Sequence, residues 1–362
     1  MDQRQVEPVP QGGGGPGGRF SNNFDFMRFA AATLVVAAHA YALHTGYSQI
    51  GLHDPVMLAG RAALAALLAT SGYLIAASWE STASPLRFAW KRFLRVVPGL
   101  IPVILVTLFI LGPLVTSLPQ DDYFAALLSP EGLAAVPFFE NGGVLGLFQD
   151  NPVAYVNGSL WTIPLEAALY GVVAALGVAG LLHRRGALPA FIALNVLVWF
   201  CWFDDVRMAK VRFSLYFLLG ALLYLRRERV TLRPAIAGGL LILLVASAMT
   251  PLAAIAGVVA IPYLTIYAAH IPLPLLNTFG RHGDFSYGIY LYHYPLQQTI
   301  IQVTANTVAI PALFGLSFAA AFACAFISWH AIERRALAAK NLRASDLRRA
   351  LGLSPRPEPF GR

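Results

Sequence analysis

The sequence predicts an all-α protein, a polytopic integral membrane bundle of about ten transmembrane helices with both termini cytoplasmic. Hydrophobic residues make up 57% of the 362 positions and charged residues only 12%, whereas soluble domains carry about 25% charged residues. The mean hydropathy is +0.62. So few charges cannot cover a soluble fold of this size, and the composition also excludes intrinsic disorder. Two cysteines, Cys201 and Cys324, exclude a disulfide scaffold and a cysteine-only zinc site.

Ten apolar stretches follow a Gly-rich N-terminal segment. Residues 1–20 contain GGGG and GPGG with scattered charges, which predicts a flexible tail and not a cleavable signal peptide. A helix crosses a bilayer with ~20 apolar residues. The stretches predicted to span lie at 24–45, 56–79, 96–117, 159–182, 187–204, 211–226, 233–250, 252–270, 284–304 and 310–331.

The segment 118–158 is predicted to be a loop with short helices outside the cytoplasm. It contains apolar fragments such as FAALL, but also Pro119, Pro130 and Pro137. It carries five acidic residues and no Lys or Arg. Because cytoplasmic loops are enriched in Lys and Arg, this composition favours the opposite side of the membrane.

The distribution of basic residues supports ten spans. With a cytoplasmic N-terminus, 22 of the 26 basic residues lie inside or at the inner rim, and only Arg61, Arg207, Lys210 and Arg212 lie outside. Counting 118–158 as a span would reverse everything downstream and break this bias. The net charge of +8 therefore indicates a lipid bilayer as the partner and no nucleic acid. The basic tail at 336–362 is predicted to be cytoplasmic, either along the anionic inner leaflet or as a solvated helix.

Ionisable side chains inside spans are costly and usually functional. Arg28 and His39 share the first span, eleven residues apart. Eleven steps of 100° return to within about 20° of the same helix face, with a rise of ~16 Å. Arg28 then lies at the inner rim and His39 past the midplane. The structural alternatives are an interfacial anchor for Arg28 and a packing hydrogen bond for His39.

Glu166 is the second buried charge, in the stretch 159–182. That stretch runs inward, which places Glu166 ~10 Å below the outer surface, at about the depth of His39. A carboxylate and an imidazole at one depth can form an orienting pair. Tyr170, four residues later, shares the face of Glu166. The sequence predicts equal depth for Glu166 and His39, but not contact.

Arg92 and Arg95 lie on neighbouring turns at the cytoplasmic rim of the third span. They can anchor the helix by the positive-inside rule, or clamp phosphates with the fork geometry of arginine. His293 lies near the middle of the ninth span, where a packing hydrogen bond beside Pro295 is the alternative to a functional role. His330 is expected to be a rim residue. No nucleotide-binding Gly-rich loop, no GxSxG elbow and no metal-ligand spacing is visible.

Six segments, in chain order, resemble the motifs of the acyltransferase-3 family of integral membrane acyltransferases. They are Arg28 and His39 as R-x10-H, SGYLIAASW at 71–79, KRFLRVVP at 91–98, NGSLWTIPLEAALYG at 157–171, SYGIYLYHYP at 286–295, and the close at Glu333 and Arg334. The chain departs from the family at Arg335, where a Pro is usual. The resemblance covers roughly residues 20–340, and we expect one membrane acyltransferase domain at 21–335.

The resemblance implies a bacterial inner-membrane, multi-pass enzyme that moves an acyl group from cytoplasmic acyl-CoA to a hydroxyl. Acetyl-CoA is the expected donor substrate, with no permanently bound cofactor and no metal. The acceptor is expected to be a carbohydrate, a glycolipid or another hydroxyl compound. Some members carry a fused extracytoplasmic SGNH domain, which we expect to be absent here because the chain ends about thirty residues after its last predicted span.

The resemblance also assigns roles. Arg28, Arg92 and Arg95 would hold the CoA phosphates, and the ~16 Å from Arg28 to His39 suits a pantetheine arm. His39 would act as general base or become transiently acylated, with Glu166 and Tyr170 beside it in the catalytic group. The expected contacts to the acceptor come from Arg61, Trp161 and His293. The competing hypothesis is a proton-coupled transporter or flippase that uses His39 and Glu166 as a relay.

Overall fold

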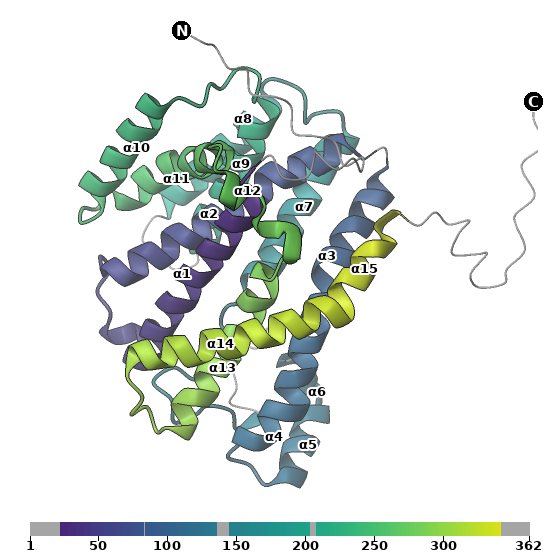
Figure 1. The fold of residues 1–362 in the computed structure, drawn as a ribbon, viewed down its shortest axis with the longest axis vertical. Coiled ribbons are helices and arrows are strands. Elements are labelled where there is room, and N and C mark those ends of the chain that lie inside the picture. Colours follow the sequence, from purple (N-terminus) through teal and green to yellow (C-terminus); the bar gives the residue numbers. More distant parts are fainter. Residues whose placement is uncertain (1–21, 83, 136–144, 203–207, 342–362) are drawn as a thin grey trace, which may run out of the picture.

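The computed structural model describes residues 22–82, 84–135, 145–202 and 208–341. The N-terminal tail predicted at 1–20 and the part of the C-terminal tail from 342 onward lie outside these ranges. All regular elements within the described ranges are helices, with no strand among them, as the composition predicts. Figure 1 shows the helices gathered in one bundle, with α10 and α11 at one end and α4, α5 and α6 at the opposite end.

Each of the ten predicted apolar segments forms a helix. Their bounds are α1 Phe24–Thr45, α2 Pro55–Glu80, α3 Pro85–Val106, α7 Thr162–Val178, α8 Ala187–Cys201, α9 Met208–Leu225, α10 Pro234–Ser247, α11 Ala253–His270, α13 Ser286–Val303 and α14 Ile310–Ser328. Two of them are extended by a π-helical turn: α3 continues through Thr107–Leu111 into α4 (Gly112–Val115), and α14 continues through Trp329–Glu333 into α15 (Arg334–Ala338).

Local sequence explains where several helices begin. In α2 the Asp54 carboxylate accepts from the backbone N–H groups of Val56 and Met57, at 2.9 and 3.0 Å. Pro55 occupies the first turn, where its missing N–H leaves no helical bond unmade. Helices α3, α10 and α14 also carry a proline in the first turn.

Six helices among the described residues are long and apolar enough to cross a membrane. They are Phe24–Thr45, Pro55–Glu80, Pro85–Val115, Met208–Leu225, Ala253–His270 and Ile310–Ala338. Helices α7, α8 and α10 are apolar but shorter. Helix α13 has 18 residues but is less apolar. The protein is therefore a multi-pass membrane protein in which ten helices were predicted correctly, and six of them have the length and composition of a span.

The segment 118–158 forms the predicted loop with short helices wherever the structure describes it. Helix α5 covers Gln120–Leu128 and α6 covers Pro130–Ala135. The hydroxyl of Tyr123 donates to the Leu108 carbonyl at 2.8 Å, within the π-helical turn that follows α3. Because a π-turn disturbs the usual i to i−4 pairing, such carbonyls need another donor. Tyr123 thereby ties this segment to the end of the long third helix.

Small residues allow the central helices to approach closely. A Cβ on Gly72 would lie 1.9 Å from the Phe217 carbonyl oxygen, and one on Gly220 would lie 2.0 Å from that of Ala69. Helices α2 and α9 therefore touch backbone to backbone. This is the contact that small residues provide in membrane bundles, where no hydrophobic effect drives helices together.

Helix α13 lies at the centre of the bundle and is buried along most of its length. It packs on α1, α3 and α14, and Gln297 and Gln298 are fully buried. Pro295 has no N–H to give the Leu291 carbonyl, and the Asn157 amide donates to that oxygen instead, at 3.0 Å. The segment before α7 is thus fixed to α13 at the turn that contains Pro295, which joins two of the sequence motifs in space.

Candidate active site

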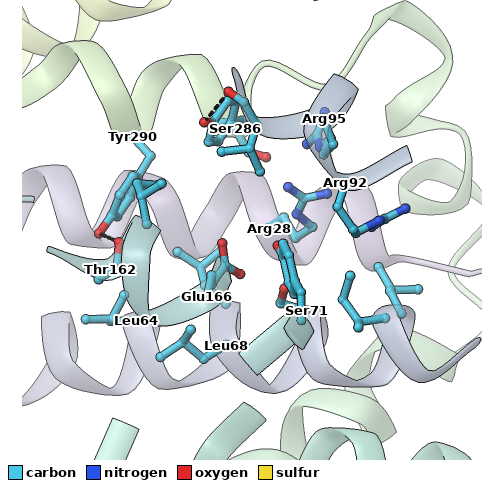
Figure 2. A pocket seen from close by; sticks show the side chains of 17 residues that line it. Arg28, Leu64, Leu68, Ser71, Arg92, Arg95, Thr162, Glu166, Ser286 and Tyr290 are labelled. Carbon is cyan, nitrogen blue, oxygen red and sulfur yellow. Dashed lines mark hydrogen bonds between the residues drawn. The ribbon is translucent and has the colours of Figure 1, made fainter. Parts of the chain in front are cut away.

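One pocket gathers residues from five helices. It has an empty volume of about 810 Å³, counting the part that opens to solvent. Helix α2 supplies a wall that is apolar except for Ser71. The other charged and polar lining residues come from α1, α3, α7 and α13: Arg28, Arg92, Arg95, Thr162, Glu166, Tyr170, Ser286, Tyr287 and Tyr290. Figure 2 shows Arg92 and Arg95 toward one end, Thr162 and Tyr290 toward the other, and Glu166 between them.

The wall from α2 is a single helix face. Leu64, Leu68, Ser71 and Ile75 line the pocket and follow one another by three or four residues. Arg61 continues this face by one turn toward the N-terminal end of α2. The pocket therefore runs along α2, and its long axis follows the helix bundle.

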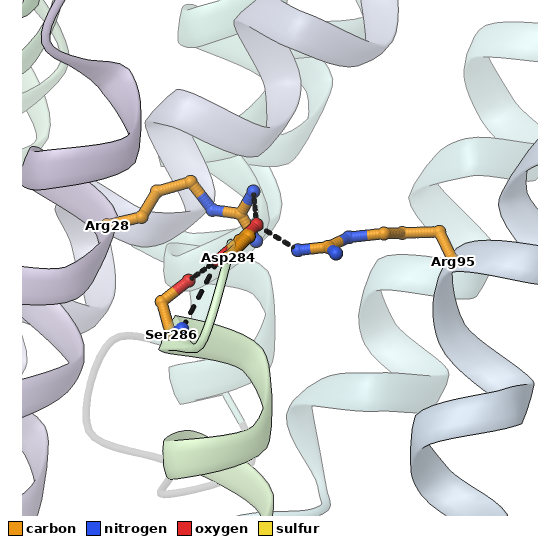
Figure 3. Close-up of polar contacts among 4 residues, drawn as sticks. All are labelled: Arg28, Arg95, Asp284 and Ser286. Carbon is orange, nitrogen blue, oxygen red and sulfur yellow. Dashed lines mark hydrogen bonds and ion pairs between the residues drawn. The ribbon is translucent and has the colours of Figure 1, made fainter. Parts of the chain in front are cut away.

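An ion-pair cluster holds two of the three pocket arginines. Asp284 Oδ2 pairs with Arg28 Nη1 at 2.9 Å and also with Arg95 Nη2 (Figure 3). Asp284 Oδ1 accepts from the Ser286 backbone N–H at the start of α13. Burial alone would raise the pKa of Asp284, but Arg28 and Arg95 outweigh it and hold that pKa well below its ordinary value. The carboxylate stays ionised and neutralises part of the arginine charge.

Sequence reasoning missed Asp284. The available signal was an acidic side chain at the first position of the predicted span 284–304, at the basic rim and two residues before the SYGIYLYHYP motif. An acid at the basic rim is expected to have a specific partner, because it opposes the local charge bias.

Arg92 differs from its two neighbours. Its Nη2 lies 3.4 Å from the Ser78 hydroxyl, and its buried Nε has no hydrogen-bond partner among the described residues. The guanidinium also lies 5.8 Å from the Phe88 ring centre. No carboxylate of the described chain forms an ion pair with Arg92, so this guanidinium retains donors for an anionic ligand.

Glu166 lies in the same pocket as the arginines, one turn inward of Thr162 along α7. No hydrogen bond or ion pair to its carboxylate occurs within the part of the chain that is described. Tyr170, one further turn along, lines the pocket as well. The predicted equal depth suggested a pair between Glu166 and His39, but the structure gives His39 a different partner and leaves Glu166 facing the arginine pocket.

That partner is His293. Its Nε2 lies 3.0 Å from His39 Nδ1, and the two ring centres are 5.1 Å apart. His293 is fully buried, whereas His39 is partly exposed. The Tyr294 ring packs against the His39 imidazole at 5.3 Å. The R-x10-H and SYGIYLYHYP motifs therefore meet at a histidine pair.

The end of the pocket away from the arginines lies close to this pair. A Cβ on Gly60 would lie 2.4 Å from that of Ala38, so α1 and α2 touch beside His39. Leu64, at the end of the pocket wall, is four residues from Gly60, a rise of about 6 Å. Tyr290 also lines the pocket, and its ring centre lies 5.9 Å from that of His293. Its hydroxyl bonds Thr162 Oγ1 at 2.8 Å and donates to the Ser159 carbonyl at 2.9 Å.

The remaining predicted site residues lie outside the pocket. Arg61 donates to the Leu52 carbonyl at 2.9 Å. Trp161 packs on Phe213, with ring centres 5.6 Å apart. His330 is at the inner end of the last long helix, where Nδ1 donates to the Phe326 carbonyl at 2.9 Å.

Comparison with known proteins agrees with the motifs. Residues 21–330 match the sequence profile of the family Acyl_transf_3, described as an acyltransferase domain. An O-acetyl transferase of Shigella phage Sf6 is 27% identical over 335 residues, which covers 88% of this chain and 96% of that protein. Nodulation protein 10 of Rhizobium leguminosarum bv. viciae is 28% identical over 368 residues, which covers 92% of this chain and 97% of that protein. No solved structure matches the chain.

Proposed function

The chain belongs to the acyltransferase-3 family, and we propose that it is a membrane O-acyltransferase that moves an acetyl group from acetyl-CoA to a hydroxyl of a carbohydrate, glycolipid or related acceptor. The observation that carries this proposal is the pocket. Residues from separate motifs line one cavity, with three guanidinium groups toward one end and the histidine pair beyond the other. A donor with an anionic head and a long arm fits that layout.

The donor head is assigned to the arginine end. Arg92 carries the guanidinium without a carboxylate partner, so it is the main phosphate ligand in this proposal. Arg28 and Arg95 share Asp284, which holds their side chains at the pocket and lowers their net charge. Arg28 and Arg95 therefore offer N–H donors in fixed directions, but they attract an anionic group less strongly than Arg92 does. Sequence reasoning treated the three arginines as equivalent, and the ion pairs now separate them.

The donor arm is assigned to the middle of the pocket. Glu166 and Tyr170 face it from α7, and Ser71 faces it from α2. The carboxylate of Glu166 can accept hydrogen bonds from amide N–H groups, which a pantetheine arm carries. Glu166 therefore acts on the donor in this proposal, and not on His39 as the sequence suggested.

Chemistry takes place at His39. Its imidazole removes the proton of the acceptor hydroxyl while the hydroxyl oxygen attacks the thioester carbonyl. The C–S bond then breaks, and the proton passes from His39 to the departing thiolate. The products are the O-acyl ester and the free thiol of CoA. The alternative is an acyl-imidazole intermediate, and rapid quenching of labelled acetyl-CoA without acceptor distinguishes them, because only that route traps label on the protein.

Acceptor binding is assigned to the outer side of His39. Arg61 lies one turn before Leu64 on the same side of α2, beyond the residues that line the pocket, and this position supports a contact with the acceptor. Trp161 packs in the helix bundle, so its contribution to acceptor binding is to hold the start of α7. The name of one relative, an O-acetyl transferase, supports an oxygen atom as the acetyl acceptor.

The topology that accompanies this function is ten spans in a bacterial inner membrane, with both termini cytoplasmic. Helices α8 and α10 expose large apolar side chains, including Leu197 and Ile242, as lipid-facing helices do. The 14 to 17 residues of α7, α8 and α10 reach ~21–26 Å, which local thinning of the bilayer accommodates. Helix α13 tolerates its polar residues because protein surrounds it.

Cysteine labelling tests the topology. In a chain with Cys201 and Cys324 replaced by serine, single cysteines within 120–128 should react with a membrane-impermeant maleimide from the outside. Single cysteines within 226–229 should react only after the membrane is opened. The reverse pattern would exclude the ten-span arrangement.

Acetyl transfer tests the function. Membranes from cells that express the chain are incubated with acetyl-CoA labelled in the acetyl group, and alkali-labile label is measured. We expect label in an O-ester fraction that depends on the chain and is lost in His39→Ala. Equal label in membranes with and without the chain would exclude the proposal and favour the proton-coupled transporter.

A further inference from the structure

His39 is bonded differently from three other histidines on long helices, His270, His293 and His330. In His270, His293 and His330 the Nδ1 atom faces the carbonyl oxygen four residues earlier, at 2.8, 3.2 and 2.9 Å. A carbonyl only accepts, so each of these Nδ1 atoms carries a proton. His39 also has a backbone partner four residues earlier, Val35, but it differs from the other three because its Nδ1 faces the ring nitrogen of another histidine.

The hydrogen-bond chain assigns the protons of the pair. His293 Nδ1–H donates to the Ile289 carbonyl. In a neutral imidazole the second nitrogen then bears the lone pair, so His293 Nε2 is an acceptor. His39 Nδ1 lies 3.0 Å from that acceptor and must therefore carry the hydrogen. This leaves the lone pair of His39 on Nε2. Two charged imidazolium rings at this distance would repel each other, so only one of the two histidines can be charged at a time.

We propose that His293 is a positioning residue that fixes His39 in the Nδ1–H tautomer, so that Nε2 is the basic nitrogen that takes the acceptor proton. This inference rests on the proposed function, and it replaces the acceptor-binding role that the sequence suggested for His293. The burial of His293 supports the replacement, because a side chain with no exposed surface cannot contact an acceptor.

The same bond serves the transfer step. When Nε2 of His39 takes the proton, Nδ1–H becomes part of an imidazolium and donates more strongly to His293. His293 thus stabilises the charge that forms during transfer and keeps the ring from rotating. The Ile289 carbonyl accepts from His293 in turn, so the series of hydrogen bonds ends at the backbone of α13.

Two amide variants separate the two bonds of His293. In His293→Gln the side-chain oxygen reaches the place of Nε2 and can accept from His39. In His293→Asn the shorter side chain reaches only the place of Nδ1, so it keeps the bond to Ile289 and loses the bond to His39. Both variants are polar amides, which makes each the control for the other.

The kinetic test is the membrane acetyl-transfer assay with varied acetyl-CoA. If Nε2 of His39 is no longer the basic nitrogen, much of the ~10²- to 10⁴-fold rate acceleration that general base catalysis supplies is lost. We expect kcat to fall about a hundredfold in His293→Asn and less than about tenfold in His293→Gln, with the KM for acetyl-CoA unchanged in both. Equal losses in the two variants, or a better-preserved Asn variant, would overturn the positioning role.

A spectroscopic test is independent of activity. Side-chain ¹⁵N shifts of the full-length protein, with the His39 signals identified by their loss in His39→Ala, report which ring nitrogen carries the proton. We expect protonated Nδ1 on His39 in the unmodified protein and a mixture of tautomers in His293→Asn. An Nε2–H tautomer in the unmodified protein would contradict the inference. If the Nδ1–H tautomer were observed but no transfer depended on the chain, the proposed function would fail and the tautomer assignment would stand.

Discussion

The two ends of the pocket are built from opposite kinds of polar group. At one end, the guanidinium groups of Arg28 and Arg95 share one carboxylate, and the third guanidinium, Arg92, lies beside them without one. Beyond the other end, two imidazoles form a short series of hydrogen bonds that ends on a backbone carbonyl. The arginine end is charged and partly compensated, whereas the histidine end needs no counter-ion.

The difference follows from what each end would do in the proposed reaction. Binding an anionic head requires fixed positive charge, and a counter-ion keeps that charge oriented without burying it alone. A general base must be free of its proton before the reaction, so a carboxylate beside His39, which would favour the imidazolium, is a disadvantage at this position. A neutral imidazole orients the base without protonating it. Five substitutions test this difference between the two ends of the pocket.

Removing the base should have the largest effect. His39→Ala is expected to lower kcat by about 10²- to 10⁴-fold, because proton transfer is lost, while the KM for acetyl-CoA stays close to the original. The labelled acetyl-CoA assay measures both. His330→Ala is the matched control, since His330 also lies on a long helix but outside the pocket. Near-normal activity in His39→Ala would remove His39 from the mechanism.

The arginine without a carboxylate partner should dominate donor affinity. Arg92→Ala is expected to raise the KM for acetyl-CoA by roughly 10- to 100-fold, which corresponds to ~1.5–3 kcal/mol for a charged hydrogen bond. Arg92→Lys should recover only part, because lysine lacks the planar fork. Arg185→Ala, an exposed arginine elsewhere, should change nothing. A larger KM effect from Arg95→Ala than from Arg92→Ala would contradict the division between them.

Loss of the carboxylate that Arg28 and Arg95 share should mainly reduce the stability of the folded protein. Asp284→Asn leaves Arg28 and Arg95 without their partner and is expected to cost about 2–3 kcal/mol, less than a fully buried pair because the side chains stay 15–23% exposed. Apparent melting temperature in detergent measures it. The pKa of Asp284 is lowered in the folded protein, so this stabilisation is present at neutral pH and is lost only as pH falls through that lowered pKa. A melting temperature that is unaffected by the change at pH 7 would disprove the role.

The contact between the two motifs at the proline of α13 should give a smaller effect. Asn157→Ala leaves the Leu291 carbonyl without a donor and is expected to cost ~1–3 kcal/mol. Adding Pro295→Ala restores a backbone N–H at position 295, so the double variant should be less destabilised than Asn157→Ala alone. Additive losses in thermal unfolding would show that the two residues do not share this carbonyl.

The smallest effect is expected at Glu166. Glu166→Gln keeps an acceptor oxygen but loses the charge, so the KM for acetyl-CoA should rise about fivefold, corresponding to ~1 kcal/mol, with kcat nearly unchanged. The same assay separates the two constants. A hundredfold fall in kcat at constant KM would return Glu166 to the side of His39 and undo the contrast between the two ends.

Apolar length alone was enough to predict the ten helices and, through the motifs, most of the residues that line the pocket. Nine helices begin and end within a few residues of the predicted stretches, whereas α3 begins at Pro85, eleven residues before the stretch predicted at 96–117. The 100° periodicity correctly indicated that Tyr170 shares a face with Glu166, since both line the pocket. These features depend on one segment at a time, and hydropathy and helix geometry are properties of a single segment.

The tertiary structure decided which polar groups meet. Equal depth suggested His39 beside Glu166, yet depth leaves rotation and lateral position open, and the packing of α13 on α1 brings His293 to His39 instead. Asp284 became visible only when the loop before α13 met α1 and α3. Side-by-side order in a membrane bundle is set by close packing of small residues and by hydrogen bonds between helices. Neither leaves a periodic trace in the sequence, so only the assembled bundle shows how the donor pocket and the histidine pair are joined.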